Sequence, residues 1–311
     1  MIFECLFDIN AAGNPFFKKI YDKIFDDLKI KYREHEFIHV QPKNEGNCMS
    51  CPGGLSNFQI TNNINKKTIL LSFWDRGMDF LNNNLGWENY NLIDYYGGIG
   101  ISMDSKEIKS TYGVNHYPLQ YPLGVVKSDE YIEKHRKSFN FDDREKRAVF
   151  IGRMHGNRKR ICEILKEHPL IDIFDETSVY HHEKYFEKIS NYLIGISLNG
   201  NGEFCLRDVE YLGMEIPIVR PKLKTTFHNK LEENKHFIPV DIISENADTR
   251  FLKYTDEEVA FKIIEKVEHI LDKKELLSTV VKEGREYYDN YTNTDYISNL
   301  FISLININNI I

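Results

Sequence analysis

The sequence predicts an α/β protein with two domains, each built around a β-sheet. In the second half, short apolar runs alternate with amphipathic segments, which is the pattern of β-α-β units in a parallel, doubly wound sheet. The 311 residues suit two domains of roughly 150 residues each. A tail with helical periodicity alone follows the last predicted strand.

The second half contains five predicted strands. The run at 148–152 is continuous and apolar, as expected of a strand buried on both faces, and the run at 192–198 is the strongest. The five strands cover residues 148–152, 170–174, 192–198, 216–220 and 237–240. The helices between them cover residues 158–166, 182–189 and a segment that follows the turn at 199–202 and ends near Gly213.

The tail of the chain is predicted to be helical. Thr255 and Glu258 form a capping box at the start of the first tail helix. An apolar stripe then continues to Leu271 at the spacing of an amphipathic helix. Further helices are expected at 276–288 and 296–304.

The first half is less regular. Its predicted elements are a helix at 16–28 and strands at 37–40, 68–73 and 92–96. The charged stretch at 134–147 is interpreted as the linker between domains. The domains are therefore expected at 1–140 and 147–285, with a final helical segment at 286–311.

Composition argues against several classes of protein. A net charge of −7 and a pI near 5.9 argue against a nucleic-acid partner. No apolar run reaches the roughly 18 to 20 residues that span a bilayer, and the N-terminus lacks the pattern of a signal peptide. The five scattered cysteines indicate reduced thiols and a cytoplasmic protein. Cys48 and Cys51 form a lone C-x-x-C, for which an incidental role is favoured over zinc or redox chemistry.

Two loops of the second half follow buried strands and open helices, where open parallel sheets bind ligands. The loop at 152–159 combines glycines with Arg153, Arg158 and Lys159, which suits a diphosphate. The alternative interpretation is a basic turn in solvent. We expect phosphate contact by Arg153 first, and by Arg158 or Lys159 second.

The second loop, at 199–210, ends the strongest strand with the glycine-rich turn that contains Gly200 and Gly202. Arg207 and Glu210 are three residues apart on the helix that follows, so they share a face. A cation there can neutralise a leaving diphosphate, and a carboxylate can accept from both ribose hydroxyls. The alternative is that Arg207 forms a surface ion pair with Glu203 while Glu210 is solvated.

Residues 202–220 resemble the donor-site segment of GT-B glycosyltransferases. That family commonly has a Gly-rich turn, an Arg or Glu at the helix start, and then Glu-Ala-Leu-x-x-Gly-x-Pro-Val. Residues 210–213 and 216–218 align with the Glu and Gly part and with the Pro-Val part of this pattern. Residues 150–153 are similar to the family's Phe-x-Gly-Arg at the first strand of the donor domain. The match runs from residue 150 to residue 220.

The resemblance implies two Rossmann-like domains that face each other across a cleft, with the C-terminal helix crossing back to the N-terminal domain. It implies transfer of a sugar from a nucleotide diphosphate sugar to a hydroxyl of a glycan or glycoconjugate, with the acceptor on the first domain. The nucleotide sugar is a co-substrate, and no cofactor is implied. Peripheral membrane association through the acceptor is compatible with this reaction.

The resemblance also implies roles for individual residues. Glu210 would bind the donor ribose, while Arg153 and Arg207 would bind the pyrophosphate, with Arg207 contributing to catalysis by stabilising the leaving diphosphate. His181 follows a predicted strand and would contact the base. The turn residues Gly53 and Gly54 would approach the donor phosphates from the other domain. No Asp-x-Asp pattern follows a convincing strand, so a catalytic metal ion is not expected.

One departure from the family concerns stereochemistry. Retaining members with a Glu-x7-Glu motif would place their first Glu at Gly202, and Glu203 is one residue out of register. The Arg-x-x-Glu spacing looks closer to exostosin-like and related branches, so we favour inversion. Inversion needs a general base from the first domain. Asp75, just past a predicted strand, is the candidate, and a helix N-cap is its alternative role.

Two other functions fit the same residues. One is a different group transferase on the same scaffold, such as a pyruvyltransferase. The other is a non-catalytic protein that binds nucleotide sugars or glycans. Binding without hydrolysis or transfer over a broad donor panel would favour the binding protein.

Overall fold

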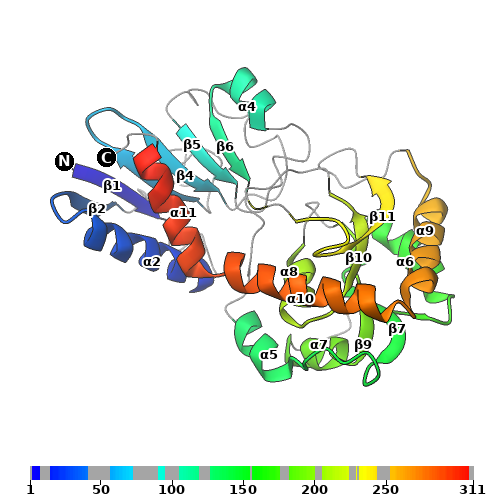
Figure 1. Ribbon diagram of the computed structural model, residues 1–311. Coiled ribbons are helices and arrows are strands. Elements are labelled where there is room, and N and C mark those ends of the chain that lie inside the picture. The colour runs from blue at the N-terminus through cyan, green and yellow to red at the C-terminus, as the bar shows by residue number, and fades with distance from the viewer. Residues whose placement is uncertain are drawn as a thin grey trace. The chain divides into compact units, whose positions relative to one another are not determined.

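The computed structural model describes residues 2–7, 15–40, 57–72, 90–94, 105–118, 127–154, 156–175, 182–199, 205–223, 229, 231–243 and 253–307. The chain forms two compact units. Unit 1 comprises Met1–Val125, Thr225–Asn229 and Tyr291–Ile311, and unit 2 comprises Val126–Lys224 and Lys230–Asn290. Each unit contains a sheet with helices packed against it (Figure 1), so the predicted α/β class is confirmed.

Unit 1 contains a mixed six-stranded sheet in the order β2-β1-β3-β4-β5-β6. Its strands are β1 (Ile2–Phe7), β2 (Glu36–Val40), β3 (Asn57–Asn62), β4 (Thr68–Ser72), β5 (Tyr90–Asp94) and β6 (Asn115–Pro118). β2, β4 and β5 confirm the three predicted strands. The other three strands were not predicted.

Strand β3 makes this sheet mixed rather than parallel, because it runs antiparallel to both β1 and β4. The turn after β3 explains this. The Asn62 side chain accepts hydrogen bonds from the backbone N–H groups of Ile64 (2.8 Å) and Asn65 (3.4 Å). Lys66 then takes a left-handed φ of 58°. This tight turn reverses the chain directly into β4, which only antiparallel neighbours allow.

Helices α2 (Pro15–Lys31) and α11 (Thr294–Ile307) pack against each other in unit 1, and α4 (Ser105–Tyr112) packs on β6. Ser298 donates to the Asp27 carboxylate at 2.6 Å, and Lys23 forms an ion pair with Asp295 at 3.2 Å. The last helix of the chain therefore belongs to the unit that contains the N-terminus, as predicted.

Unit 2 contains a parallel five-stranded sheet in the order β11-β10-β9-β7-β8. Its strands are β7 (Glu145–Gly152), β8 (Ile171–Asp175), β9 (Tyr192–Ile196), β10 (Ile218–Lys222) and β11 (Ile238–Ile243). All five were predicted. The chain passes from β7 outward to β8 and then returns to the other side of β7 to form β9. This reversal of strand order lies at the carboxyl ends of β7 and β9, which is where doubly wound sheets form the crevice that binds ligands, and we call this region the crevice.

Helices cover both faces of this sheet. α6 (Asn157–Lys166) packs on α9 (Asp256–Ile270), while α7 (His182–Ile189) and α8 (Leu206–Gly213) both pack on α5 (Lys127–His135). Right-handed crossovers place these two groups on opposite faces. The capping box at the start of α9 is confirmed, because the side chains of Thr255 and Glu258 each accept a hydrogen bond from the backbone N–H of the other residue.

Helix α10 (Lys274–Tyr291) lies against α8 through two glycines. A Cβ on Gly284 would lie 2.8 Å from Leu212, and one on Gly213 would lie 2.8 Å from Tyr288. Arg285 also donates to the Gly213 carbonyl at 2.8 Å, which satisfies the end of α8. The position of α8 is therefore fixed at its carboxyl end.

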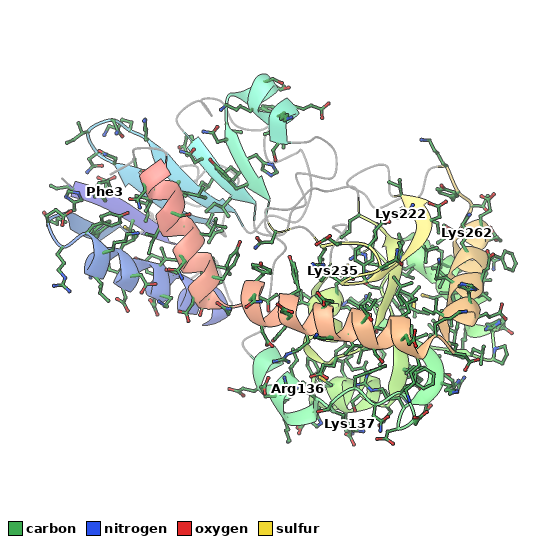
Figure 2. All side chains as sticks on the ribbon, viewed as in Figure 1. Phe3, Arg136, Lys137, Lys222, Lys235 and Lys262 are labelled. Atoms are coloured by element: carbon green, nitrogen blue, oxygen red, sulfur yellow. The ribbon has the colours of Figure 1, made fainter. Side chains whose placement is uncertain are left out.

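The interpretation of 134–147 as a linker is wrong, because this stretch belongs to unit 2. Phe141 is buried in the core of that unit, and the buried Arg144 donates to the Lys137 and Met214 carbonyls. Arg136 and Lys137 lie on the outside of the unit (Figure 2). Exposed charges outnumber the buried anchors here, so the composition resembled that of a linker. Among the described helices, none is long and apolar enough to cross a membrane.

Candidate functional site

The start of α8 stands at the crevice between β7 and β9, and a buried ion pair fixes it. Asp208 accepts from the backbone N–H of Cys205, the N-cap residue, at 2.7 Å. The other oxygen of the same carboxylate lies 2.8 Å from the Arg220 guanidinium on β10, and both side chains are almost completely buried. The first turn of α8 is thus tied to the neighbouring strand.

Arg207 extends from this first turn across the end of β7. Its Nε donates to the Ile151 carbonyl at 2.7 Å, and its guanidinium carbon lies 4.4 Å from the centroid of the Phe150 ring. A Cβ on Gly152 would lie 1.9 Å from Arg207 Nη2, so only glycine leaves room for the guanidinium there. The predicted alternative of a surface residue is wrong for Arg207, because its side chain is only 8% exposed.

One guanidinium nitrogen of Arg207 takes no part in these contacts. Nη1 is buried and has no hydrogen-bond partner in the part of the chain that the structure describes. An arginine keeps its charge at every pH at which the protein is folded. A buried charged donor without a partner costs more than the roughly 1–3 kcal/mol of a neutral group. This nitrogen is therefore positioned to bind an anion.

Glu210 lies one turn further along α8 and is also buried, with 8% exposure, so the alternative of a solvated Glu210 is wrong. Tyr185, from α7, stands beside it. Burial raises the pKa of Tyr185 well above its usual value, and the Glu210 carboxylate raises it further. The phenol therefore stays protonated next to the carboxylate. The neighbouring Tyr211 donates to the Val149 carbonyl at 3.3 Å, which holds this turn of α8 on β7.

The structure gives Arg158 a bracing role, and the expected phosphate contact stays a prediction. Its Nε donates to the Asn199 carbonyl and its Nη2 to the Leu198 carbonyl, both at 2.7 Å. Nη2 also lies 3.4 Å from the Cys205 sulfur. Burial lowers the pKa of Arg158, and the nearby Arg207 lowers it further. Two of its three nitrogens hold the end of β9 against the start of α8.

Two polar side chains at the end of β9 were missed by the sequence analysis. Ser197 is 1% exposed and Asn199 is 4% exposed. Neither the Ser197 hydroxyl nor either polar atom of the Asn199 carboxamide has a hydrogen-bond partner among the described residues. The one feature of the sequence that could have pointed to these two residues is their position directly after a buried strand at the crevice.

Arg153 follows β7 directly and is exposed, so its charge lies in solvent next to the crevice. Helix α6 begins shortly after it, at a Gly156 with a left-handed φ of 55° and no side-chain cap. The other predicted site residues lie outside the described residues, so their roles stay predictions: Asp75, Gly53, Gly54, Gly200, Gly202 and His181.

The crevice therefore combines a buried cation with a free donor, a buried carboxylate one turn away, and the start of a helix. The cation and the helix start favour an anionic group, and the carboxylate favours a hydroxyl donor beside it. The ligand that matches this order is an anion bonded to a hydroxyl-bearing group.

No protein family model and no curated protein matches the chain. Several solved structures resemble it. TarM has 14% identity and a TM-score of 0.41, over 70% of this chain and 43% of its own. The pneumococcal O-GlcNAc transferase GtfA, in complex with UDP and GlcNAc, has 12% identity and a TM-score of 0.42, over 69% and 44%. A glycosyltransferase from Rickettsia africae has 10% identity and a TM-score of 0.45, over 72% and 63%. The chain thus spans less than two thirds of each of these proteins, and such weak similarity leaves its activity to be argued from the site.

Proposed function

We propose that the chain is a glycosyltransferase that moves a sugar from a nucleoside diphosphate sugar to a hydroxyl of a glycan or glycoconjugate. The observation that supports this most is the unpartnered Nη1 of Arg207, buried at the crevice between β7 and β9. A folded protein tolerates such a group when a ligand satisfies it. The diphosphate of a sugar donor has the charge and the oxygen atoms to do so.

The neighbouring residues divide the donor among them in this proposal. Arg207 and the first N–H groups of α8 bind the diphosphate. Glu210, about 4.5 Å further along the helix axis, accepts from the ribose hydroxyls. Arg153 adds a solvent-exposed cation at the edge of the crevice.

Charge stabilisation is the main catalytic contribution in this proposal. As the bond between sugar and diphosphate breaks, negative charge grows on the leaving oxygen. A fixed, buried guanidinium stabilises that charge without rearrangement. We also propose that transfer requires no divalent cation, so EDTA should leave the rate unchanged.

A thermal-shift screen with UDP, GDP, ADP, dTDP and CMP tests donor binding. A nucleotide at 100 times its Kd should raise the Tm of the wild-type protein by about 5 to 10 °C. Arg207→Ala should weaken the binding of that nucleotide by about 10- to 100-fold. Arg160→Ala is the matched control, because Arg160 is exposed and pairs with Glu257 on the surface. The donor site is refuted if no nucleotide shifts the Tm, or if the two variants bind alike.

Two further measurements separate the parts of the proposal. Glu210→Gln should weaken binding of the nucleotide but not binding of inorganic pyrophosphate, because only the nucleotide has ribose hydroxyls. Release of the nucleoside diphosphate from a nucleotide sugar should occur with wild type and fail with Arg207→Ala. Binding that depends on Arg207 without any release or transfer would instead identify a binding protein.

A further inference from the structure

Asn199 is a buried amide at the end of β9. Its side chain is 4% exposed, and neither Nδ2 nor Oδ1 has a hydrogen-bond partner in the described segments. Its backbone, by contrast, is firmly held, because Arg158 donates to its carbonyl at 2.7 Å. Leaving a buried amide unsatisfied is costly, and most such groups in native proteins have a partner.

The position of Asn199 relative to α8 indicates which part of a donor it would meet. Arg158 binds both the Asn199 carbonyl and the sulfur of Cys205, the residue that precedes α8. Asn199 therefore stands before the start of the helix, while Arg207 lies in its first turn and Glu210 in its second. Along the direction of the helix axis, the three residues therefore follow one another in the order Asn199, Arg207, Glu210.

We propose that the Asn199 carboxamide binds the sugar that is transferred. This inference rests on the proposed function, in which Glu210 binds the ribose and Arg207 the diphosphate. In a nucleoside diphosphate sugar the diphosphate separates the ribose from the sugar. The group next to Arg207 on the side away from Glu210 is then the sugar.

An amide offers a donor and an acceptor side by side. The Nδ2 group donates to a sugar oxygen, and Oδ1 accepts from a sugar hydroxyl or from the N–H of an acetamido group. A sugar with only hydroxyls and a sugar with an acetamido group both offer a donor and an acceptor on adjacent positions of a pyranose ring. Asn199 would thus discriminate between sugars, not between nucleosides.

The test compares a nucleotide with its sugar conjugates by calorimetric titration, using UDP, UDP-glucose and UDP-N-acetylglucosamine, or GDP and GDP-mannose if GDP binds. Asn199→Leu should leave the affinity for the free nucleotide unchanged and lower the affinity for a sugar conjugate by about 10- to 100-fold. Weakening of both UDP conjugates indicates a hydroxyl contact, and weakening of the N-acetyl form alone indicates an acetamido contact. The same variant should raise the Tm of the unliganded protein by about 2 to 4 °C, because it removes an unsatisfied amide.

Asn91 provides the matched control. It is also 4% exposed, but its Oδ1 accepts from Asn115 at 2.9 Å. Asn91→Leu should therefore lower the Tm and leave every affinity unchanged. Should Asn199→Leu fail to fold, Asn199→Ala removes both polar atoms of the amide without adding bulk or charge, and it should weaken the binding of the conjugates only.

The proposal is overturned if the Asn199 variants bind conjugate and nucleotide as wild type does, or if they lose both to the same extent. A lower Tm for Asn199→Leu with unchanged affinities would show a purely structural amide. If wild type binds no nucleotide at all, the proposed function itself fails. If wild type binds nucleotides through Arg207 and Asn199 has no effect on the conjugates, only this inference fails.

Discussion

A single methyl group at Gly152 should displace the central cation of the site. In Gly152→Ala, the new Cβ would lie 1.9 Å from Arg207 Nη2 and 2.9 Å from its Cζ. Distances this short are impossible, and β7 is held in place by β8, which pairs with it as far as Gly152, and by β9, which pairs with it as far as Val149. The guanidinium must therefore leave its position over the end of β7.

The cost of that displacement follows from the contacts that Arg207 makes. It would lose a charge-assisted hydrogen bond to the Ile151 carbonyl (2.7 Å), worth about 1.5–3 kcal/mol. It would also lose its stacking on the Phe150 ring, worth about 1–2 kcal/mol for a desolvated pair. The free energy of unfolding should fall by about 3–5 kcal/mol in total. Nucleotide binding should weaken at the same time, because in the proposed function the same guanidinium binds the diphosphate.

A double-mutant cycle tests the reasoning by urea unfolding of wild type, Gly152→Ala, Arg207→Ala and the double variant. If Gly152 is needed to admit Arg207, its replacement should cost little once Arg207 is gone, and the coupling energy should be about 3 kcal/mol. Gly156→Ala is the control. It has a φ of 55° and a ψ of −138°, a conformation strained for other residues, and open space around it, so the change should cost about 1–3 kcal/mol in either background. Equal costs of Gly152→Ala in both backgrounds would refute the close-approach explanation.

Three further changes have effects of known sign. Arg220→Met leaves the buried Asp208 carboxylate without its guanidinium partner, so it should cost about 3–5 kcal/mol in chemical unfolding. The double change with Asp208→Leu should recover part of this cost, because it removes the buried charge but also the cap on the Cys205 N–H. A double variant as unstable as the single one would contradict this. Thr255→Ala removes the cap of α9 and should cost about 1 kcal/mol, measured as a lower Tm, and an unchanged Tm would count against the cap. Burial raises the pKa of Cys162 to about 12 from 9.0, so unfolding releases a proton above pH 9 and stability should fall between pH 9 and 12 by up to about 1.4 kcal/mol per pH unit. Unfolding free energies at successive pH values should show a smaller slope for Cys162→Ala, and identical slopes would exclude this thiol as the source.

The sequence predicted the sheet of unit 2 better than that of unit 1 for a physical reason. A parallel strand covered on both faces must be apolar throughout, and β7 and β9 are recognisable from that alone. In unit 1, β3 (Asn57–Asn62) and β6 (Asn115–Pro118) contain mostly polar residues. Their strand conformation depends on pairing with β4 and β5, which no local pattern records.

The same distinction applies to the site. Arg207 and Glu210 were predicted because their spacing and the following Gly and Pro are local features of the chain. Tyr185 comes from another helix, and the partner of Asp208 comes from another strand, so only folding brings these residues to the site. Arg158 shows the limit of such local features. Its place in a basic loop suggested a ligand contact, but the sequence did not show that two of its nitrogens hold the carbonyls at the end of β9.

The buried charges around the crevice explain why it should take up an anion. Among the described residues, three guanidinium groups are buried there, those of Arg158, Arg207 and Arg220, against two carboxylates, those of Asp208 and Glu210. Asp208 neutralises Arg220 directly, at 2.8 Å. Arg158 and Arg207 then have one of the described carboxylates between them; burial lowers the pKa of Arg158, and the charge of Arg207 lowers it further. A positive charge in excess in a buried site is costly without a counterion. An anionic ligand supplies that counterion, so its binding stabilises the fold and fills the site through the same interaction.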